Sequence, residues 1–256
     1  MIAGALAKKV TKALSIRAIL TLSKRQKLHL VRSGIDENII HVVYSGVDID
    51  KFLPRSESHL NKLKEELGFN LDDPIILYYG PLNSLRGTDE LIKAIPRVLA
   101  HFPETRFVFL SRTTKNDYCS MKSRRDILSY ENTHLVEGVL RQEQLLKYLA
   151  IADIIVLPFR FWPFIECPLT VLESMALAKP LITSYSGAIP EIVKNNENGV
   201  LINPYSREIA KAILTLLRNR NLAVQLGVNA RKCVEKYYSW QKVIDQTEYA
   251  FEKSIS

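Results

Sequence analysis

The sequence predicts an α/β domain built on a doubly wound parallel sheet, preceded by a short helical segment. Short runs of Val, Ile, Leu, Tyr and Phe alternate with amphipathic stretches of helical period. These runs are apolar on both faces, as expected for strands that helices cover on both sides. Such alternation predicts a parallel sheet. The 256 residues, 47% hydrophobic and 24% charged, exclude a disordered chain and provide a full hydrophobic core.

The predicted elements follow one another in strand–helix order along most of the chain. The expected strands are Ile39–Ser45, Pro74–Gly80, Thr105–Ser111, His134–Glu137, Asp153–Pro158, Pro180–Ser184 and Gly199–Ile202. The expected helices are Thr88–His101, Gln142–Ile151, Leu169–Ala178, Ile189–Lys194, Ser206–Asn219, Asn221–Tyr237 and Trp240–Ile255. In doubly wound sheets ligands bind beyond the carboxyl ends of strands, so the functional residues are expected in post-strand turns.

The amino end differs from this pattern. Residues 1–38 look helical, with one strand-like run at Ala18–Leu22, and we divide the chain into segments 1–45 and 46–256. The stretch Met1–Leu22 contains four basic residues, so we expect an amphipathic helix and not a signal peptide. No apolar run reaches the roughly 18 residues of a membrane span.

Charge and cysteine content narrow the function classes. The net charge of +8 predicts an anionic partner, which leaves nucleotide phosphates, nucleic acid and an anionic membrane surface open. Cys119, Cys167 and Cys233 lack the spacing of metal ligands. We therefore expect free thiols, no metal site and a cytoplasmic protein.

The first candidate turn runs from Gly80 to Gly87. Its glycines permit a tight turn that approaches a ligand closely. Arg86 lies just before a helix, where it could pair with a phosphate, and Asp89 favours the helix start. The alternative is a plain turn with a surface arginine, and the turn by itself favours that alternative.

The second turn carries two carboxylates around a predicted helix start. Pro168 suits the first helical position, because its missing N–H has no partner there anyway. The free N–H groups of Leu169, Thr170 and Val171 would then form an anion site, with Glu166 before it and Glu173 one turn later. The alternative is a pair of solvated charges beside a helix start.

Two further turns carry weaker signals. Tyr185–Glu191 follows a predicted strand, and helix punctuation is as good an interpretation there as a ligand site. Val139–Gln142 follows another strand, and its backbone, at Leu140 in particular, could read the edge of a nucleobase.

Taken together and in order, these segments resemble the retaining glycosyltransferases of family 4, which have the GT-B fold. The blocks that carry the resemblance are Ser45–Asp48 with Phe52, Ala152–Pro158, Leu172–Ile182, Gly187–Val193 with Asn198–Gly199, and Ser239–Trp240. They are specific as an ensemble and weak singly. The resemblance covers roughly Leu20 to the end. It implies that residues 46–256 are the Rossmann-like, donor-binding second domain, and that residues 1–45 are a mainly helical remnant of the first.

The resemblance also implies a chemistry. A nucleotide-diphospho-sugar, UDP- or GDP-linked, would bind without a metal or other cofactor, and its glycosyl group would pass to an acceptor hydroxyl with retained configuration. Glu173 would hold the ribose hydroxyls. Arg86 and the helix start at Leu169–Val171 would stabilise the departing diphosphate. Gly80, Leu140 and Thr170 complete the expected donor site, and the acceptor would be a glycan or a lipid-linked molecule.

Several positions depart from the family pattern. Six residues separate Glu166 from Glu173 where the family has seven, so a gap-free alignment puts Ile165 in place of the first glutamate. We still expect Glu166 to reach the donor sugar. Pro81 replaces a common arginine, and Pro168 replaces a usual glycine and removes one backbone donor.

The family's first domain, which supplies much of the acceptor site, is nearly absent. Only 45 residues precede Gly46, fewer than the ~50 that a small domain needs. His29 and His41 are therefore expected on surfaces and not in catalysis. We expect the first domain to be missing or separately encoded.

Three functions remain open: an active donor-binding half, a non-catalytic nucleotide-sugar-binding or scaffolding half-enzyme, and a nucleic-acid-binding domain. The last explains the charge but lacks interleaved aromatic and basic residues. The helices at the two ends would expose apolar faces that favour self-association or a partner. The alternative for the amino end is peripheral binding at the inner membrane surface through Lys8, Lys9 and Lys12.

Overall fold

A computed structural model describes residues 9, 11, 13–111, 118–160 and 166–255. The main body is a six-stranded parallel sheet in the order β5-β4-β3-β6-β7-β8, confirming the predicted fold class. Its strands are β3 (Ile75–Tyr79), β4 (Arg106–Ser111), β5 (Thr133–Glu137), β6 (Ile154–Leu157), β7 (Leu181–Ser184) and β8 (Val200–Ile202). The strand order runs outward in both directions from β3 and β6, so the order switches between these two central strands.

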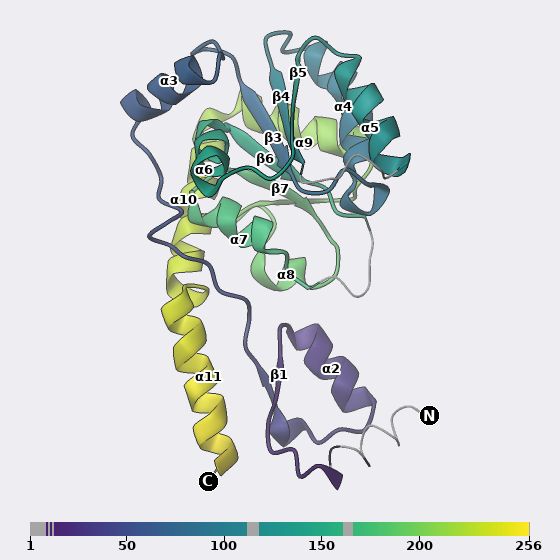
Figure 1. Ribbon diagram of the computed structural model, residues 1–256, viewed down its shortest axis with the longest axis vertical. Coiled ribbons are helices and arrows are strands. Elements are labelled where there is room, and N and C mark those ends of the chain that lie inside the picture. The colour runs from purple at the N-terminus through teal and green to yellow at the C-terminus, as the bar shows by residue number, and fades with distance from the viewer. Residues whose placement is uncertain (1–8, 10, 12, 112–117, 161–165, 256) are drawn as a thin grey trace.

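Helices cover both faces of this sheet (Figure 1). On one face, α4 packs against both α5 and α9. On the other face, α7 packs against α10, and α6 packs against α3. These helices are α3 (Glu57–Glu66), α4 (Thr88–Leu99), α5 (Tyr118–Leu128), α6 (Gln142–Ile151), α7 (Leu169–Ala176), α9 (Ser206–Arg218) and α10 (Arg220–Tyr237). All residues of β3, β6 and β7 are buried, as the apolar runs of these strands predict.

The amino-terminal segment forms a small strand–helix–strand unit. Its elements are β1 (Ile19–Thr21), α2 (Lys24–Arg32), the 3₁₀ turn η1 (Glu37–Ile39) and β2 (Ile40–Val42). The strand-like run predicted at Ala18–Leu22 is confirmed by β1, which pairs in parallel with β2. The predicted strand at Ile39–Ser45 exists, but it lies in this separate two-stranded sheet because β1, and not a strand of the main sheet, is its neighbour.

Helix α11 (Trp240–Ile255) leaves the main body and extends on the same side as the amino-terminal unit (Figure 1). Trp240 contacts the start of the main domain, because a Cβ added to Gly46 would lie 2.9 Å from its ring. Trp240, Ile244, Phe251 and Ile255 share one helical face and are each about half exposed or more. The exposed apolar surface predicted for this helix is therefore present. No helix in the described part of the chain is long and apolar enough to cross a membrane.

Several element boundaries differ from the prediction. Helices α3 and α5 were not predicted, because their sequences are mostly polar and show little apolar periodicity. Helix α8 (Ile189–Ile192) and helix α7 are each two residues shorter than predicted. Helix α7 ends early because Ala178 adopts a left-handed φ of 55°, which turns the chain toward β7.

Candidate functional site

Apart from Leu140, the predicted site residues follow β3 and β6 at the carboxyl edge of the sheet, where the strand order switches. Strand β3 leads to a turn that contains the 3₁₀ turn η2 (Ser84–Arg86), and α7 begins 12 residues after the end of β6. Both segments leave the sheet side by side because β3 and β6 are hydrogen-bonded neighbours. A switch point is where open α/β sheets bind ligands.

The turn after β3 is held rigidly against the end of β6. Gly87 has a left-handed φ of 73°, and a Cβ added to it would lie 1.9 Å from the carbonyl oxygen of Pro158. The amide of Arg160 donates to the carbonyl of Leu85 at 3.0 Å. Glycine at position 87 is therefore required both by the backbone conformation and by this close approach.

The Arg86 guanidinium lies over the ring of Phe159, 5.1 Å from its centroid, in cation–π geometry. Its backbone N–H donates to the side chain of Asn83 at 3.0 Å, so the turn fixes the arginine at the base of the site. The side chain is partly exposed and remains available to an anion. Asp89 lies in the first turn of α4 as predicted, and it accepts a hydrogen bond from Ser123.

The second turn differs in detail from its prediction. Pro168 is the N-cap of α7, with an extended ψ of 142°, and not its first helical residue. The N–H of Val171 donates to the Pro168 carbonyl at 2.9 Å. The expectation of three free amides is therefore wrong for Val171, and the amides of Leu169 and Thr170 are the two left as candidates for an anion.

Two oxygen atoms beside this helix start are buried without a hydrogen-bond partner in the described structure. They are Oε2 of Glu166 and Oγ1 of Thr170. Buried polar atoms nearly always have partners, so two such atoms at one helix start make it a candidate position for a ligand. The adjacent thiol of Cys167 is buried, which raises its pKa and keeps it protonated. Ile165, the alternative position for the first glutamate, lies outside the described residues.

Glu173 is tied to the sheet by a residue that the sequence reasoning missed. The hydroxyl of Tyr79, the last residue of β3, lies 3.1 Å from Glu173 Oε2 and 2.5 Å from the carbonyl oxygen of Thr170. The structure thus ties Glu173 and Thr170 to the last residue of β3, which precedes Gly80 with its φ of 143°. A polar group at the end of an otherwise apolar run was the available signal for Tyr79.

Leu140 lies at the same edge of the sheet but further from the centre. It follows β5, two strands from β3, which corresponds to roughly 10 Å at normal strand spacing. Leu140 is partly buried, and the neighbouring Val139 is 90% exposed. The structure thus leaves an exposed apolar residue at that end of the site.

Arg160 is a second cation that the sequence reasoning did not select. It lies three residues after the end of β6, it is exposed, and its amide bonds to the turn that carries Arg86. A cation directly after a buried strand was the signal. His29 is exposed on α2 and His41 is partly buried in β2, away from this edge as expected.

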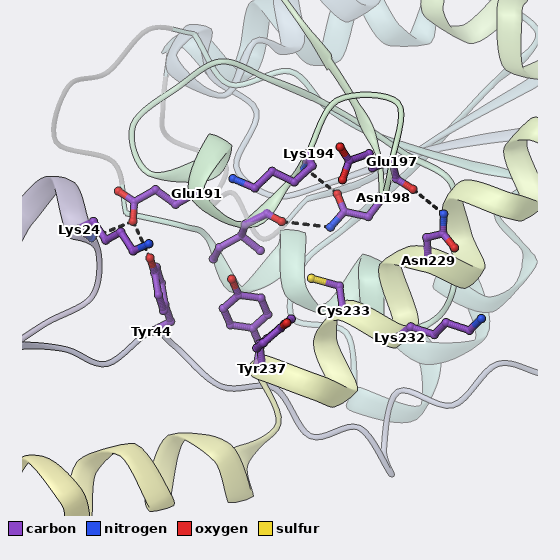
Figure 2. Close-up of a pocket in the computed structure, with 12 residues that line it drawn as sticks. Lys24, Tyr44, Glu191, Lys194, Glu197, Asn198, Asn229, Lys232, Cys233 and Tyr237 are labelled. Atoms are coloured by element: carbon purple, nitrogen blue, oxygen red, sulfur yellow. Dashed lines mark hydrogen bonds between the residues drawn. The ribbon is translucent and has the colours of Figure 1, made fainter.

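The turn at Tyr185–Glu191 leads into α8, with Ala188 as its N-cap and Pro190 in its first turn, so helix punctuation is confirmed, and Glu191 makes further contacts. The Glu191 carboxylate accepts hydrogen bonds from the amides of Lys24 and Arg25 at 2.8 and 2.9 Å and from the Tyr44 hydroxyl at 2.8 Å. It therefore joins α8 to the amino-terminal unit. Figure 2 shows Glu191 between Lys24 and Tyr44 at one side of a cavity of about 500 Å³.

That cavity shares no lining residue with the predicted site. Its lining includes Lys24, Tyr44, Glu191, Asn198, Cys233 and Tyr237 and none of the predicted donor-site residues.

Cys167 and Cys233 are free thiols as expected, and the side chain of Cys119 lies outside the described part. Among the described residues, no group of three or more His, Cys, Asp or Glu side chains could hold a metal ion.

Comparison with known proteins gives a consistent family assignment. Over 224 residues the chain is 25% identical to spore coat protein SA of Bacillus subtilis, covering 83% of this chain and 58% of that protein. Two similar crystal structures are a glycosyltransferase from Rickettsia africae and Anabaena Alr3699/HepE in complex with UDP and glucose. Their TM-scores are 0.81 and 0.79, at 21% and 17% identity.

The two structural alignments cover 97% and 98% of this chain and 67% of each neighbour, so the chain spans about three-fifths to two-thirds of the proteins it matches. Residues 61–233 match the family described as glycosyl transferases group 1. This match includes the turn after β3, the start of α7 and the Glu191 turn. The chain belongs to the glycosyl transferases group 1 family.

Proposed function

We propose that this chain binds a nucleoside-diphospho-sugar, UDP- or GDP-linked, at the carboxyl edge of β3 and β6, and that it acts in transfer of the glycosyl group to an acceptor hydroxyl with retained configuration. The observation that carries the proposal is the start of α7 at the switch point, where Glu166 Oε2 and Thr170 Oγ1 are buried without partners. The UDP and glucose bound by the Anabaena neighbour support this ligand class.

Each residue has a role in this proposal. The amides of Leu169 and Thr170 and the guanidinium of Arg86 bind the diphosphate from two sides. As the bond from the sugar to the diphosphate breaks, negative charge grows on the leaving oxygen, and these fixed positive groups stabilise it. Neither group has to move, because the turn is already bonded to the segment after β6 and the helix start to Tyr79 of β3.

The two glutamates recognise hydroxyl groups. Glu173 accepts hydrogen bonds from the ribose hydroxyls, and Glu166 from the hydroxyls of the transferred sugar. The unpartnered Oε2 of Glu166 supports the latter role, because a sugar hydroxyl would satisfy it. Leu140 and the exposed Val139 contact the base. In this proposal the chemistry uses no metal and no further cofactor.

The acceptor side of the site is the part of the proposal that depends on another domain. The chain covers 58% of spore coat protein SA. We propose that a further domain, in the same polypeptide or a separate one, supplies the glycan or lipid-linked acceptor and closes the cleft. Without it, the chain binds the donor and transfers slowly or not at all.

A donor titration combined with a transfer assay tests this function. The protein is incubated with radiolabelled UDP- and GDP-sugars, and binding, hydrolysis and transfer are measured for the wild type and for E173Q. Glu104→Gln is the matched control, since Glu104 is exposed and lies just before β4, at the opposite edge of the sheet. We expect the wild type to bind one nucleotide class. Its affinity for that nucleotide should fall about tenfold or more in E173Q and stay the same in E104Q.

The outcomes separate the alternatives. Binding without transfer or hydrolysis, even with an added acceptor domain from a relative, would favour a non-catalytic nucleotide-sugar-binding half. If neither nucleotide class raises the thermal stability at millimolar concentration, both the catalytic and the non-catalytic proposals fail.

A further inference from the structure

Two consecutive tyrosines end the central strand β3, and each is tied to a different wall of the site. Their side chains alternate across the sheet. The Tyr78 hydroxyl donates to the carbonyl of Pro81 at 2.6 Å, in the turn that leads to Arg86. The Tyr79 hydroxyl contacts the first turns of α7. The other three residues of β3 are Ile75, Ile76 and Leu77, so these two hydroxyls are the polar side-chain groups of the strand.

The contacts of Tyr79 are dense for a single hydroxyl. Its oxygen lies 2.5 Å from the Thr170 carbonyl oxygen, 3.1 Å from Glu173 Oε2 and 3.3 Å from Ser174 Oγ. Ser174 also donates to the Thr170 carbonyl at 2.7 Å. All three partners belong to the first two turns of α7, so one side chain of the sheet fixes both the helix start and the glutamate that follows it.

The hydroxyl acts as a donor in this network. Tyr79 is 6% exposed, and burial, reinforced by the nearby Glu173 charge, raises its pKa well above the ordinary value. It therefore keeps its proton throughout the neutral range. A carboxylate accepts hydrogen bonds only, so the single hydroxyl proton, shared between the Thr170 carbonyl at 2.5 Å and Glu173 Oε2 at 3.1 Å, favours one orientation of the Glu173 side chain.

We propose that Tyr79 is a positioning residue that orients the Glu173 carboxylate, and the first turn of α7 with it, for the nucleotide before the nucleotide binds. The inference rests on the proposed function for the role of Glu173, whereas the orientation itself concerns the ligand-free protein. Tyr79 is not itself a ligand-contacting group, because it is buried and its oxygen faces the helix. A site oriented in advance loses less entropy on binding.

The test compares crystal structures of the ligand-free wild type and Y79F, which removes one oxygen atom and keeps the ring. The matched control is Y78F, which loses a hydroxyl of the same strand whose bond goes to Pro81 and not to α7. We expect the Glu173 carboxylate to change its rotamer in Y79F and to keep it in Y78F. An unmoved Glu173 in Y79F would overturn the proposal.

A double-mutant cycle on nucleotide affinity gives the functional half of the test. UDP and GDP are titrated into wild type, Y79F, E173Q and the double variant. If Tyr79 acts through Glu173, Y79F weakens binding by about tenfold, and the double variant binds no more weakly than E173Q. Independent, multiplicative losses would overturn the proposal.

The proposed function and this inference fail separately. If the wild type binds neither nucleotide but Glu173 moves in Y79F, the proposed function fails while the positioning of Glu173 by Tyr79 stands. If the nucleotide binds and Glu173 stays in place, the positioning fails and the proposed function stands.

Discussion

The carboxylate of Glu191 accepts a hydrogen bond from the hydroxyl of Tyr44 at 2.8 Å, across the junction between α8 and the amino-terminal unit. The same carboxylate accepts hydrogen bonds from the backbone amides of Lys24 and Arg25 at the start of α2. The helix dipole favours a negative charge at this position. Burial, reinforced by Glu191, raises the pKa of Tyr44 and keeps it a donor. One side chain thus holds a helix of the other unit at its amino end.

The first prediction concerns this junction. In E191Q the side chain loses its charge and one acceptor oxygen, so we expect the start of α2 to lose about 1–2 kcal/mol of stabilisation. Hydrogen exchange of the α2 amides should become several-fold faster. The control is E197Q in the lining of the same cavity, where no side-chain bond to the described residues is lost. Equal exchange rates in the two variants would contradict the capping role.

The second prediction concerns the turn that carries Arg86. G87A places a Cβ 1.9 Å from the Pro158 oxygen at a φ of 73°, so both backbone strain and overlap destabilise it. We expect a loss of about 2 kcal/mol or more in the free energy of unfolding, and weaker nucleotide binding. G68A is a matched control, because Gly68 has a φ of 78° but nothing within 4 Å of an added Cβ.

Urea denaturation of both glycine variants measures the difference. The strain is common to the two positions, so the excess loss in G87A reports the overlap with Pro158 alone. Equal losses in G87A and G68A would show that the turn moves away from Pro158 at little cost. The close approach would then not be needed to hold Arg86.

The third prediction concerns the phosphate specificity of Arg86. In R86Q the guanidinium is lost, and we expect affinity for a nucleoside diphosphate to fall about 10- to 100-fold, the usual range for a charged hydrogen bond. Affinity for the nucleoside without phosphates should not change. R218Q removes an exposed charge at the end of α9 and controls for net charge. Calorimetric titration with both ligands measures the two affinities.

A loss of nucleoside affinity equal to the loss of diphosphate affinity would contradict the role given to Arg86. It would mean that the substitution disturbs the whole site, for example by releasing the cation–π contact with Phe159. R86K separates these effects further, because it keeps the charge but not the planar group that stacks on a ring.

The fourth prediction concerns pH and Lys179, in the connection from α7 to β7. Burial lowers the pKa of Lys179 to about 8, an effect that Asp153 opposes and Lys64 reinforces. Its pKa in the unfolded chain is about 10.4. Between these values the unfolded state binds more protons, so the stability contributed by this group rises with pH across that window. Below pH 8 its charge destabilises the fold.

Replacing the lysine tests this sign. We expect K179M to be more stable than the wild type at pH 7, and the advantage to shrink as pH rises from about 8 toward 10. Urea denaturation at pH 7.0 and 9.5 measures it, and the difference between the two proteins cancels the other titrating groups. A pH-independent difference between them would contradict a protonation effect.

Much of the fold could be predicted because the strands are short apolar runs that can be recognised in the sequence by themselves. The runs from Ile75 and from Ile154 are apolar on both faces, and their burial in the structure follows from that pattern. Helices α3 and α5 could not be found the same way. Helix α3 has only Leu60 and Leu63 as apolar side chains in ten residues, and tertiary contacts with α6 hold it.

Individual residues of the candidate site could be selected from the sequence, but their spatial relationships could not. Arg86 and Glu173 were selected because post-strand turns carry ligand groups, but placing their two segments at neighbouring strands of the β3–β6 switch required the strand order. Pro168 was placed one position too far into the helix, since sequence rules do not separate the N-cap from the first helical residue. Tyr79 was missed because a tyrosine ending an apolar strand is interpreted as core.

The most direct test of nucleotide binding at this edge is hydrogen–deuterium exchange of the backbone amides with saturating UDP or GDP. We predict that one nucleotide slows exchange at Leu169 and Thr170 and in the turn before Arg86, and that E173Q weakens this protection. Absence of protection at the start of α7 with either nucleotide, or protection confined to the cavity beside Glu191, would contradict the account.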